Sequence, residues 1–244
     1  MLSSINVVFE DNDLIVIDKP AGMLVLLDRY DLSLPNLYGI LKKKYGQLFV
    51  VHRIDKETSG LIIFAKSEES HQSLNSQFEH RETEKEYQAL CKGEPEVEEG
   101  QIELSLAEDK GKKERMKVNR VAGKEAITNY SVLERFDGYS LIQVRPRTGR
   151  THQIRVHLKA IGLPILGDSL YATGEGFYLS QIKPAYRTNG VEKPLLDRTA
   201  LHASRLSITH PRTGQRISFE AEMPKDMRIT LNYLRKFRNK PLTL

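Results

Sequence analysis

The chain has 244 residues, of which 39% are hydrophobic and 28% are charged, a composition typical of a globular protein with a substantial core. No hydrophobic run approaches the roughly 18 residues that span a bilayer, and the first residues lack the features of a signal peptide, so we expect a cytoplasmic protein with no membrane partner. The single cysteine, Cys91, excludes an intrachain disulfide, and the net charge of +5 favours an anionic partner.

Short apolar runs bounded by turn-forming residues predict strands along most of the chain. In chain order, these strands cover residues 6–10, 14–18, 49–51, 61–65, 87–91, 128–134, 139–144, 201–208 and 216–219. Apolar residues spaced three or four apart predict helices. These helices cover residues 36–45, 67–80, 151–160 and 224–237. The mixture of hairpins and isolated helices predicts an α+β domain with a largely antiparallel sheet.

Two charged segments are expected to be loops. Residues 94–100 are acidic, so we expect them to lie away from any bound phosphate. Residues 109–124 have few large apolar side chains, and they are either solvated and mobile or, in a phosphate-binding protein, in contact with a nucleic-acid backbone. The basic residues of this second segment are Lys110, Lys112, Lys113, Arg115, Lys117, Arg120 and Lys124.

Asp55 lies in the polar turn between the predicted strands 49–51 and 61–65, both expected to be buried on two faces. Serine, threonine and glycine follow it, and these residues satisfy or relax the backbone of turns. Position alone therefore makes Asp55 an ordinary turn residue, with no chemical role implied.

Asp55 is also part of an ordered series of motifs. The series consists of Asp18-Lys19-Pro20-Ala21-Gly22, His52-Arg53-Ile54-Asp55-x-x-Thr58-Ser59-Gly60, Lys85-Glu86-Tyr87, Arg147-Thr148-Gly149-Arg150-Thr151-His152-Gln153-Ile154-Arg155-Val156-His157 and Pro164-Ile165-Leu166-Gly167-Asp168-x-x-Tyr171. Together the motifs resemble the signatures of the RluA family of RNA pseudouridine synthases.

The resemblance implies an isomerase that converts a specific uridine of tRNA or large-subunit ribosomal RNA to pseudouridine without a cofactor. It also implies the pseudouridine synthase fold, in which helices flank a mixed, mainly antiparallel central sheet with a catalytic cleft. We expect residues 1–244 to form a single catalytic domain without an S4 domain, because the first motif begins too early to leave room for one. The expected partner is RNA, and no protein partner is indicated.

The resemblance further implies that Asp55, Tyr87 and Arg155 are catalytic. Asp55 would act either as a nucleophile on the sugar or as a base at carbon 2 of the ribose. Arg155 would keep this carboxylate ionised, unless it is an ordinary phosphate contact. Tyr87 would stack on the uracil, unless it is a core tyrosine. A uracil inside folded RNA must be flipped out, and Arg53 would fill the space or contact the backbone.

RNA contacts are expected from residues of the motifs and of the basic segment. They are His52, Arg53, Lys85, Lys112, Lys113, Arg115, Lys117, Arg147 and Arg150. A metal site at His52, His152 and His157 is not expected, because no cysteine or carboxylate framework accompanies them at ligand spacing. The alternative function is a catalytically silent RNA-binding or ribosome-assembly factor on the same fold, and the presence of Asp55, Tyr87 and Arg155 argues against it.

Overall fold

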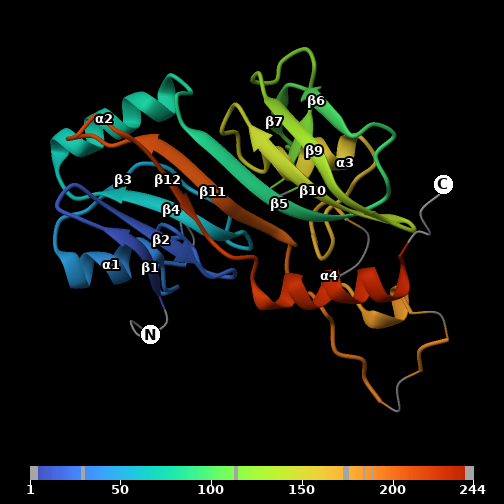
Figure 1. Cartoon of the computed structure of the whole chain (residues 1–244). Helices are drawn as coiled ribbons and strands as arrows, with labels where there is room; N and C mark the ends of the chain where they lie inside the picture. The colour runs from blue at the N-terminus through green and yellow to red at the C-terminus, as the bar shows by residue number, and fades with distance from the viewer. Residues whose placement is uncertain are drawn as a thin grey trace. The chain divides into compact units, whose positions relative to one another are not determined.

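The computed structural model describes residues 5–28, 31–112, 115–172, 176–183, 185–187 and 190–239. Its strands are β1 (Asn6–Glu10), β2 (Leu14–Lys19), β3 (Phe49–Val50), β4 (Ser59–Ala65), β5 (Glu84–Lys92), β6 (Glu99–Glu103), β7 (Leu106–Glu108), β8 (Met116–Val118), β9 (Ile127–Phe136), β10 (Tyr139–Pro146), β11 (Leu201–Thr209) and β12 (Arg216–Glu220). Its helices are α1 (Leu37–Tyr45), α2 (Glu68–Glu79), α3 (Gln153–Ala160) and α4 (Lys225–Phe237), with the 3₁₀ turn η2 (Leu179–Gln181). Strands and isolated helices together confirm the predicted α+β class (Figure 1).

The chain divides into two compact units. Unit 1 comprises residues 1–86 and 202–222, and unit 2 comprises residues 87–201 and 223–244. None of the described helices combines the length and hydrophobicity that crossing a bilayer requires. The single-domain prediction remains a prediction, because two compact units can belong to one catalytic domain.

In unit 1, β1, β2, β4, β11 and β12 lie side by side (Figure 1). The pairs β1–β2, β2–β4 and β11–β12 are antiparallel, whereas β4 and β11 are parallel, so the sheet is mixed and mainly antiparallel as predicted. Every residue of β4 is buried. The prediction that residues 49–51 are buried on both faces is wrong, because Phe49 and Val50 are half-buried in the short strand β3, which pairs with β4.

The helix starts of unit 1 follow from their capping residues. Asn36 caps α1 by accepting a hydrogen bond from the backbone N–H of Gly39. Ser67 caps α2 in the same way from Ser70, as its sequence position predicts. The turn after Asp55 ends at Gly60, whose φ is +108°, and a Cβ there would lie 2.2 Å from the carbonyl oxygen of Ala203. Glycine is therefore required where β11 approaches β4.

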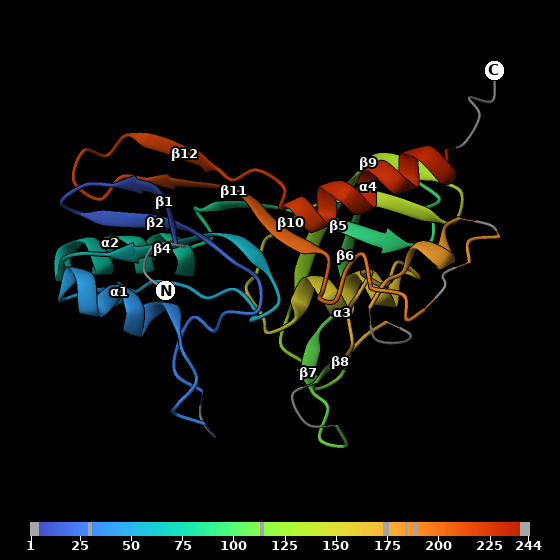
Figure 2. The same ribbon diagram turned by 90° about the horizontal axis from the view of Figure 1, so that it is seen from below.

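In unit 2, the antiparallel order is β5-β10-β9-β6. Its main hydrophobic core includes residues of these strands, of α3 and of α4. The expectation of a loop over residues 109–124 is wrong at its centre, since β8 pairs with β7 in a separate hairpin, visible in Figure 2. Met116 and Val118 pack against a small cluster of Leu106, Ala126, Val156 and Tyr171. Two apolar residues in a basic segment are too weak a pattern to predict this strand.

One smaller expectation for unit 2 also needs correction. The acidic segment 94–100 is not entirely a loop, because β6 already begins at Glu99. On α3, Ile154 and Leu158 are buried, whereas Ile161, just beyond the helix end, is 38% exposed.

Candidate functional site

Asp55 lies half-buried in the turn that joins β3 to β4 in unit 1. Its carbonyl oxygen accepts a hydrogen bond from the N–H of Thr58 at 3.1 Å, which closes the turn. Ile54 and Thr58 on either side are buried, whereas the side chain of Arg53 is exposed. The turn is thus anchored at both ends in the core, while a carboxylate and a guanidinium remain accessible from solvent.

Lys19, to which the sequence analysis assigned no role, fixes this turn from inside the unit. Its side chain is fully buried, and its Nζ donates to the carbonyl oxygens of Pro20, Met23 and Lys56 at 2.9, 2.9 and 3.0 Å. The N–H of Gly22 donates to the same Lys56 carbonyl at 2.9 Å. An ammonium has three donors, and here three main-chain carbonyls accept from it. The motif that begins at Asp18 therefore holds the residue next to Asp55.

The side chain of His52 packs and hydrogen-bonds within unit 1. Its ring stacks on Phe78 with 4.6 Å between the ring centroids, and its Nε2 accepts from the N–H of Ile63 at 3.2 Å. Burial and the nearby charge of Lys85 lower the pKa of His52 to about 3, so the ring is neutral at physiological pH. The RNA contact expected of His52 remains a prediction.

Lys85 lies near the same ring system. Its Nζ is 5.8 Å from the centroid of Phe78. Burial, together with the charge of Arg81, lowers the pKa of Lys85. An ammonium that is poorly hydrated gains more from a phosphate than a fully solvated one does, which is compatible with the RNA contact expected here.

Tyr87 belongs to unit 2 and lies on β5, on the strand that the sequence predicts. It pairs with Val144 of β10, and its ring is half-buried against the main core of that unit. Its expected role against the uracil remains a prediction.

Arg155 is 4% exposed on α3, so its guanidinium is buried and needs a partner of opposite charge. The carboxylate that the structure describes is Asp168. The Nε and Nη2 atoms of Arg155 each donate to one oxygen of Asp168 at 2.7 Å, a two-point pair that fixes the plane of the guanidinium. The pairing with Asp55 that we expected remains a prediction. Asp168 lay in a quoted motif, but nothing in its spacing distinguished it from other acids.

The buried members of the long motif around α3 form one hydrogen-bonded chain. Gln153 accepts from the hydroxyl of Thr148 at 2.7 Å and donates to the hydroxyl of Thr128 at 2.9 Å. His157 Nε2 donates to the carbonyl of Leu104 at 2.9 Å, so its Nδ1 accepts from Thr128, also at 2.9 Å. Burial lowers the pKa of His157, which keeps this ring neutral. These side chains hold the loop before α3.

The exposed members of the same motif point to solvent. Arg147 and Arg150 are exposed, and Arg150 Nε donates to the carbonyl of Glu125 at 3.0 Å. In the basic segment, Lys112 and Lys117 are exposed, and Lys117 lies 3.3 Å from a carboxylate oxygen of Asp109. Arg115 lies over the ring of Tyr171 at 5.2 Å. Lys113 lies outside the described residues. The exposed cations of unit 2 that are expected to contact RNA therefore come from two stretches, the motif before α3 and the basic segment around β8.

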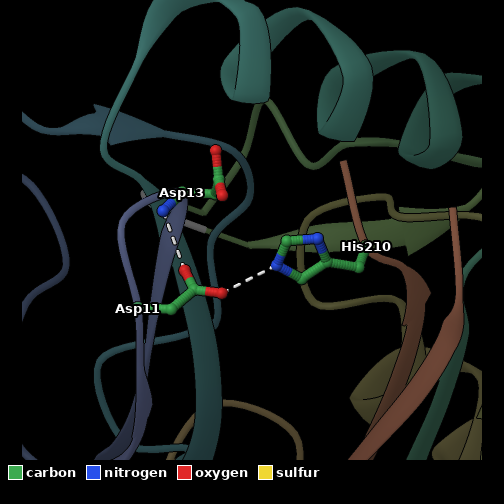
Figure 3. A group of neighbouring side chains, drawn as sticks. All are labelled: Asp11, Asp13 and His210. Carbon is green, nitrogen blue, oxygen red and sulfur yellow. Dashed lines mark hydrogen bonds and ion pairs between the residues drawn. The ribbon is translucent and has the colours of Figure 1, made fainter. Parts of the chain in front are cut away.

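A second group of polar side chains, which the sequence analysis missed, lies in unit 1 (Figure 3). Ligand atoms of Asp11, Asp13 and His210 lie within 4.8 Å of one another, a spacing that could hold a metal ion. However, His210 Nδ1 accepts from the N–H groups of Arg212 and Thr213, so its Nε2 carries the proton that it donates to Asp11 at 2.7 Å. Arg212 also pairs with Asp13 at 2.8 Å. The three side chains are thus hydrogen-bonded or ion-paired within the protein, and they connect the turn between β1 and β2 to the turn between β11 and β12.

The family model for RNA pseudouridylate synthases matches residues 13–160, a range that includes Asp55, Tyr87 and Arg155. The chain belongs to this family. The resemblance that the motifs indicated is confirmed, and so is the enzyme class, since pseudouridine synthases are isomerases.

Relatives of this pseudouridine synthase share most of its length. The ribosomal large subunit pseudouridine synthase D of Zymomonas mobilis subsp. mobilis is 36% identical over 240 residues, which cover 94% of this chain and 73% of the relative. The dual-specificity RNA pseudouridine synthase RluA of Haemophilus influenzae is 34% identical, with 89% of this chain and 93% of the relative covered. The solved structure of human RNA pseudouridylate synthase domain containing 4 has a TM-score of 0.70 at 26% identity, covering 94% of this chain and 93% of that one. This structural similarity supports the predicted pseudouridine synthase fold.

Proposed function

We propose that this pseudouridine synthase isomerises a specific uridine in tRNA or large-subunit ribosomal RNA, and that Asp55 supplies the essential carboxylate. The observation that carries the proposal is the turn of Asp55, whose backbone is held by the buried ammonium of Lys19. This turn lies within the residues that the family model matches. A rigid backbone keeps a reacting group within the narrow range of positions that catalysis requires.

The reaction breaks the bond between the sugar and nitrogen 1 of uracil, turns the base and rejoins it through carbon 5. Nitrogen 1 gains a proton and carbon 5 loses one, so the atoms and electrons of substrate and product are the same. Asp55 would either attack the sugar directly or remove the proton from carbon 2 of the ribose. Both roles require an ionised carboxylate that the substrate can reach and that the bound base desolvates, and the half-buried position of Asp55 is compatible with both.

The target uridine must leave the stack before its base can turn. Extruding a nucleotide costs a few kcal/mol, and a side chain that fills the vacated space offsets part of that cost. Arg53 is exposed two residues before Asp55, so it is the side chain that we assign to this task. Tyr87 would offer its aromatic face to the extruded uracil.

Exposed cations would hold the RNA backbone. Arg147, Arg150, Lys112 and Lys117 are exposed on unit 2, and the chain carries a net charge of +5. Guanidinium and ammonium groups bind phosphate oxygens and release condensed counterions, which supplies affinity without reading sequence.

The choice of RNA follows from the relatives. One relative is named for the large ribosomal subunit and another for dual specificity. We therefore propose large-subunit ribosomal RNA or tRNA as the substrate of this chain.

The proposal is tested by incubating the purified protein with transcripts of large-subunit ribosomal RNA and of tRNA, and then mapping pseudouridine by selective chemical labelling. We expect a new pseudouridine at a defined position in at least one transcript and none in transcripts incubated without protein. Tight RNA binding with no new pseudouridine in any cellular RNA would instead favour the silent RNA-binding factor.

A further inference from the structure

Tyr171 connects two elements of unit 2 that are distant in sequence. Its side chain is 3% exposed. Its hydroxyl accepts a hydrogen bond from the backbone N–H of Met116 on β8 at 2.8 Å and lies 2.9 Å from Nδ1 of His152, the residue before α3. One phenol oxygen therefore touches both the hairpin and the start of the helix.

The hydrogen bond to Met116 satisfies a strand edge. β7 and β8 form a two-stranded sheet of their own, with Met116 opposite Glu108. One edge of β8 therefore pairs with β7. The N–H of Met116 donates to the hydroxyl of Tyr171 rather than to another strand. A backbone donor left without an acceptor costs free energy when it is buried, so this contact favours the docked position of the hairpin.

The backbone of Tyr171 is itself fixed to α3. The Oδ1 atom of Asp168 accepts from the N–H groups of Leu170 and Tyr171 at 3.0 and 3.1 Å, while both of its oxygens bind Arg155. The tyrosine is thus tied through its main chain to the carboxylate that orients Arg155, and through its hydroxyl to the hairpin.

Cationic side chains of both the β7–β8 hairpin and α3 lie near the ring of Tyr171. Arg115 of the hairpin lies 5.2 Å from its centroid, and Arg155 and Lys159 of α3 lie at 5.0 and 6.0 Å. Arg155 is neutralised by Asp168. Arg115 Nε is buried and has no hydrogen-bond partner among the described residues, and Lys159 is exposed. Two cations beside one aromatic ring, from two elements, form a favourable position for a phosphate.

We propose that Tyr171 is a positioning residue that docks the β7–β8 hairpin on α3, so that Arg115 and Lys159 are presented together to the backbone phosphates of bound RNA. The part of this inference that concerns RNA rests on the proposed function. The docking itself does not, because it concerns contacts within the protein.

The docking is tested with Tyr171→Phe, which removes the hydroxyl and keeps the ring. Amide hydrogen exchange of Met116, measured by NMR on the RNA-free protein, should become at least about tenfold faster, because its N–H loses its acceptor. Tyr130→Phe is the matched control: Tyr130 is a buried tyrosine on β9 of the same unit, and its replacement should leave Met116 exchange as in the wild type. Unchanged exchange at Met116 in Tyr171→Phe would overturn the proposal.

The consequence for RNA is tested with a fluorescein-labelled oligouridylate as the probe. Tyr171→Phe and Arg115→Gln should each raise the Kd about 3- to 10-fold, whereas Arg115→Gln should leave Met116 exchange as in the wild type. Faster Met116 exchange with an unchanged Kd would overturn the link between docking and RNA. If the wild-type protein does not bind the probe, the proposed function is contradicted, and the exchange measurement still decides the docking.

Discussion

At the residue scale, two buried charges fix residues that we assign to the proposed site. Lys19 is fully buried with three carbonyl acceptors, and Arg155 is buried with the two oxygens of Asp168. A buried charge is costly unless its hydrogen bonds are complete, so each of these residues makes its local backbone conformation obligatory. Lys19 fixes the backbone of the Asp55 turn, and the pair with Asp168 fixes the orientation of the Arg155 guanidinium.

Replacing Lys19 by Met should destabilise the protein by about 3 to 5 kcal/mol, because three carbonyl oxygens lose a charged donor. Chemical denaturation measures this loss. Lys56→Met changes an exposed lysine of the Asp55 turn and should lower stability by less than about 0.5 kcal/mol. Equal losses in the two variants would show that the buried ammonium does not hold the turn.

Replacing Asp168 by Asn should cost about 3 to 5 kcal/mol, because it leaves a buried guanidinium without its counter-charge. The matched control is Asp137→Asn, which removes the exposed partner of Arg238 in the same unit. An exposed pair contributes about 1 kcal/mol at most, so the control should unfold almost as the wild type does. A small loss from Asp168→Asn would contradict the assignment of the pair as a structural one.

At the element scale, strong periodic patterns were predictable and weak ones were not. Residues 6–10 and 14–18 form a hairpin because apolar runs flank an Asp-Asn-Asp turn, whose Asp11 carboxylate accepts from the N–H groups of Asp13 and Leu14. β8 could not be predicted because the contacts that it makes, with Tyr171 and a small hydrophobic cluster, involve residues distant in sequence. The pairing of Arg155 with Asp168 was not predictable either, since spacing cannot select one acid among 32.

The loop before α3 contains buried residues that hold the backbone and exposed arginines that we propose as RNA contacts, and this proposal is testable. Arg147→Gln and Arg150→Gln should each make the negative slope of log K against log salt concentration shallower by about 0.7, the loss of one phosphate contact to a single strand. Lys43→Gln removes an exposed lysine of α1 to which we assign no RNA contact, and it should leave the slope unchanged. Titrations of labelled RNA at several salt concentrations measure the slopes. Unchanged slopes in the two arginine variants would refute the assignment.

At the scale of the whole molecule, stability depends on neutral histidines and ionised acids. The pKa of His52 is lowered to about 3 and that of His157 is lowered too, mainly by burial. Burial raises the pKa of Asp11, but hydrogen bonds from His210 and the backbone outweigh it, so the net shift is downward. All three groups bind protons more readily in the unfolded chain, so each destabilises the fold as pH falls. The two histidines lower the stability of the fold below about pH 6.5, and Asp11 lowers it below about pH 4.

The contribution of His52 can be isolated between pH 6.5 and 4.5, above the range in which Asp11 titrates. In this window the unfolding free energy of the wild type should fall with decreasing pH more steeply than that of His52→Gln. The difference in slope should be at most about 1.4 kcal/mol per pH unit. Denaturant titrations at several pH values measure both curves. Parallel curves would show that the ring of His52 takes up a proton in the folded state as easily as in the unfolded chain.

Asp55→Asn removes the carboxylate to which we assign the reaction. The substitution keeps the size of the side chain and the backbone of the turn, so we expect RNA binding within about twofold of the wild type and a turnover rate at least about 10³-fold lower. Glu57→Gln, which neutralises the neighbouring acid of the same turn, should keep normal turnover. Pseudouridine formed by Asp55→Asn at the wild-type rate would show that the reaction does not depend on this carboxylate.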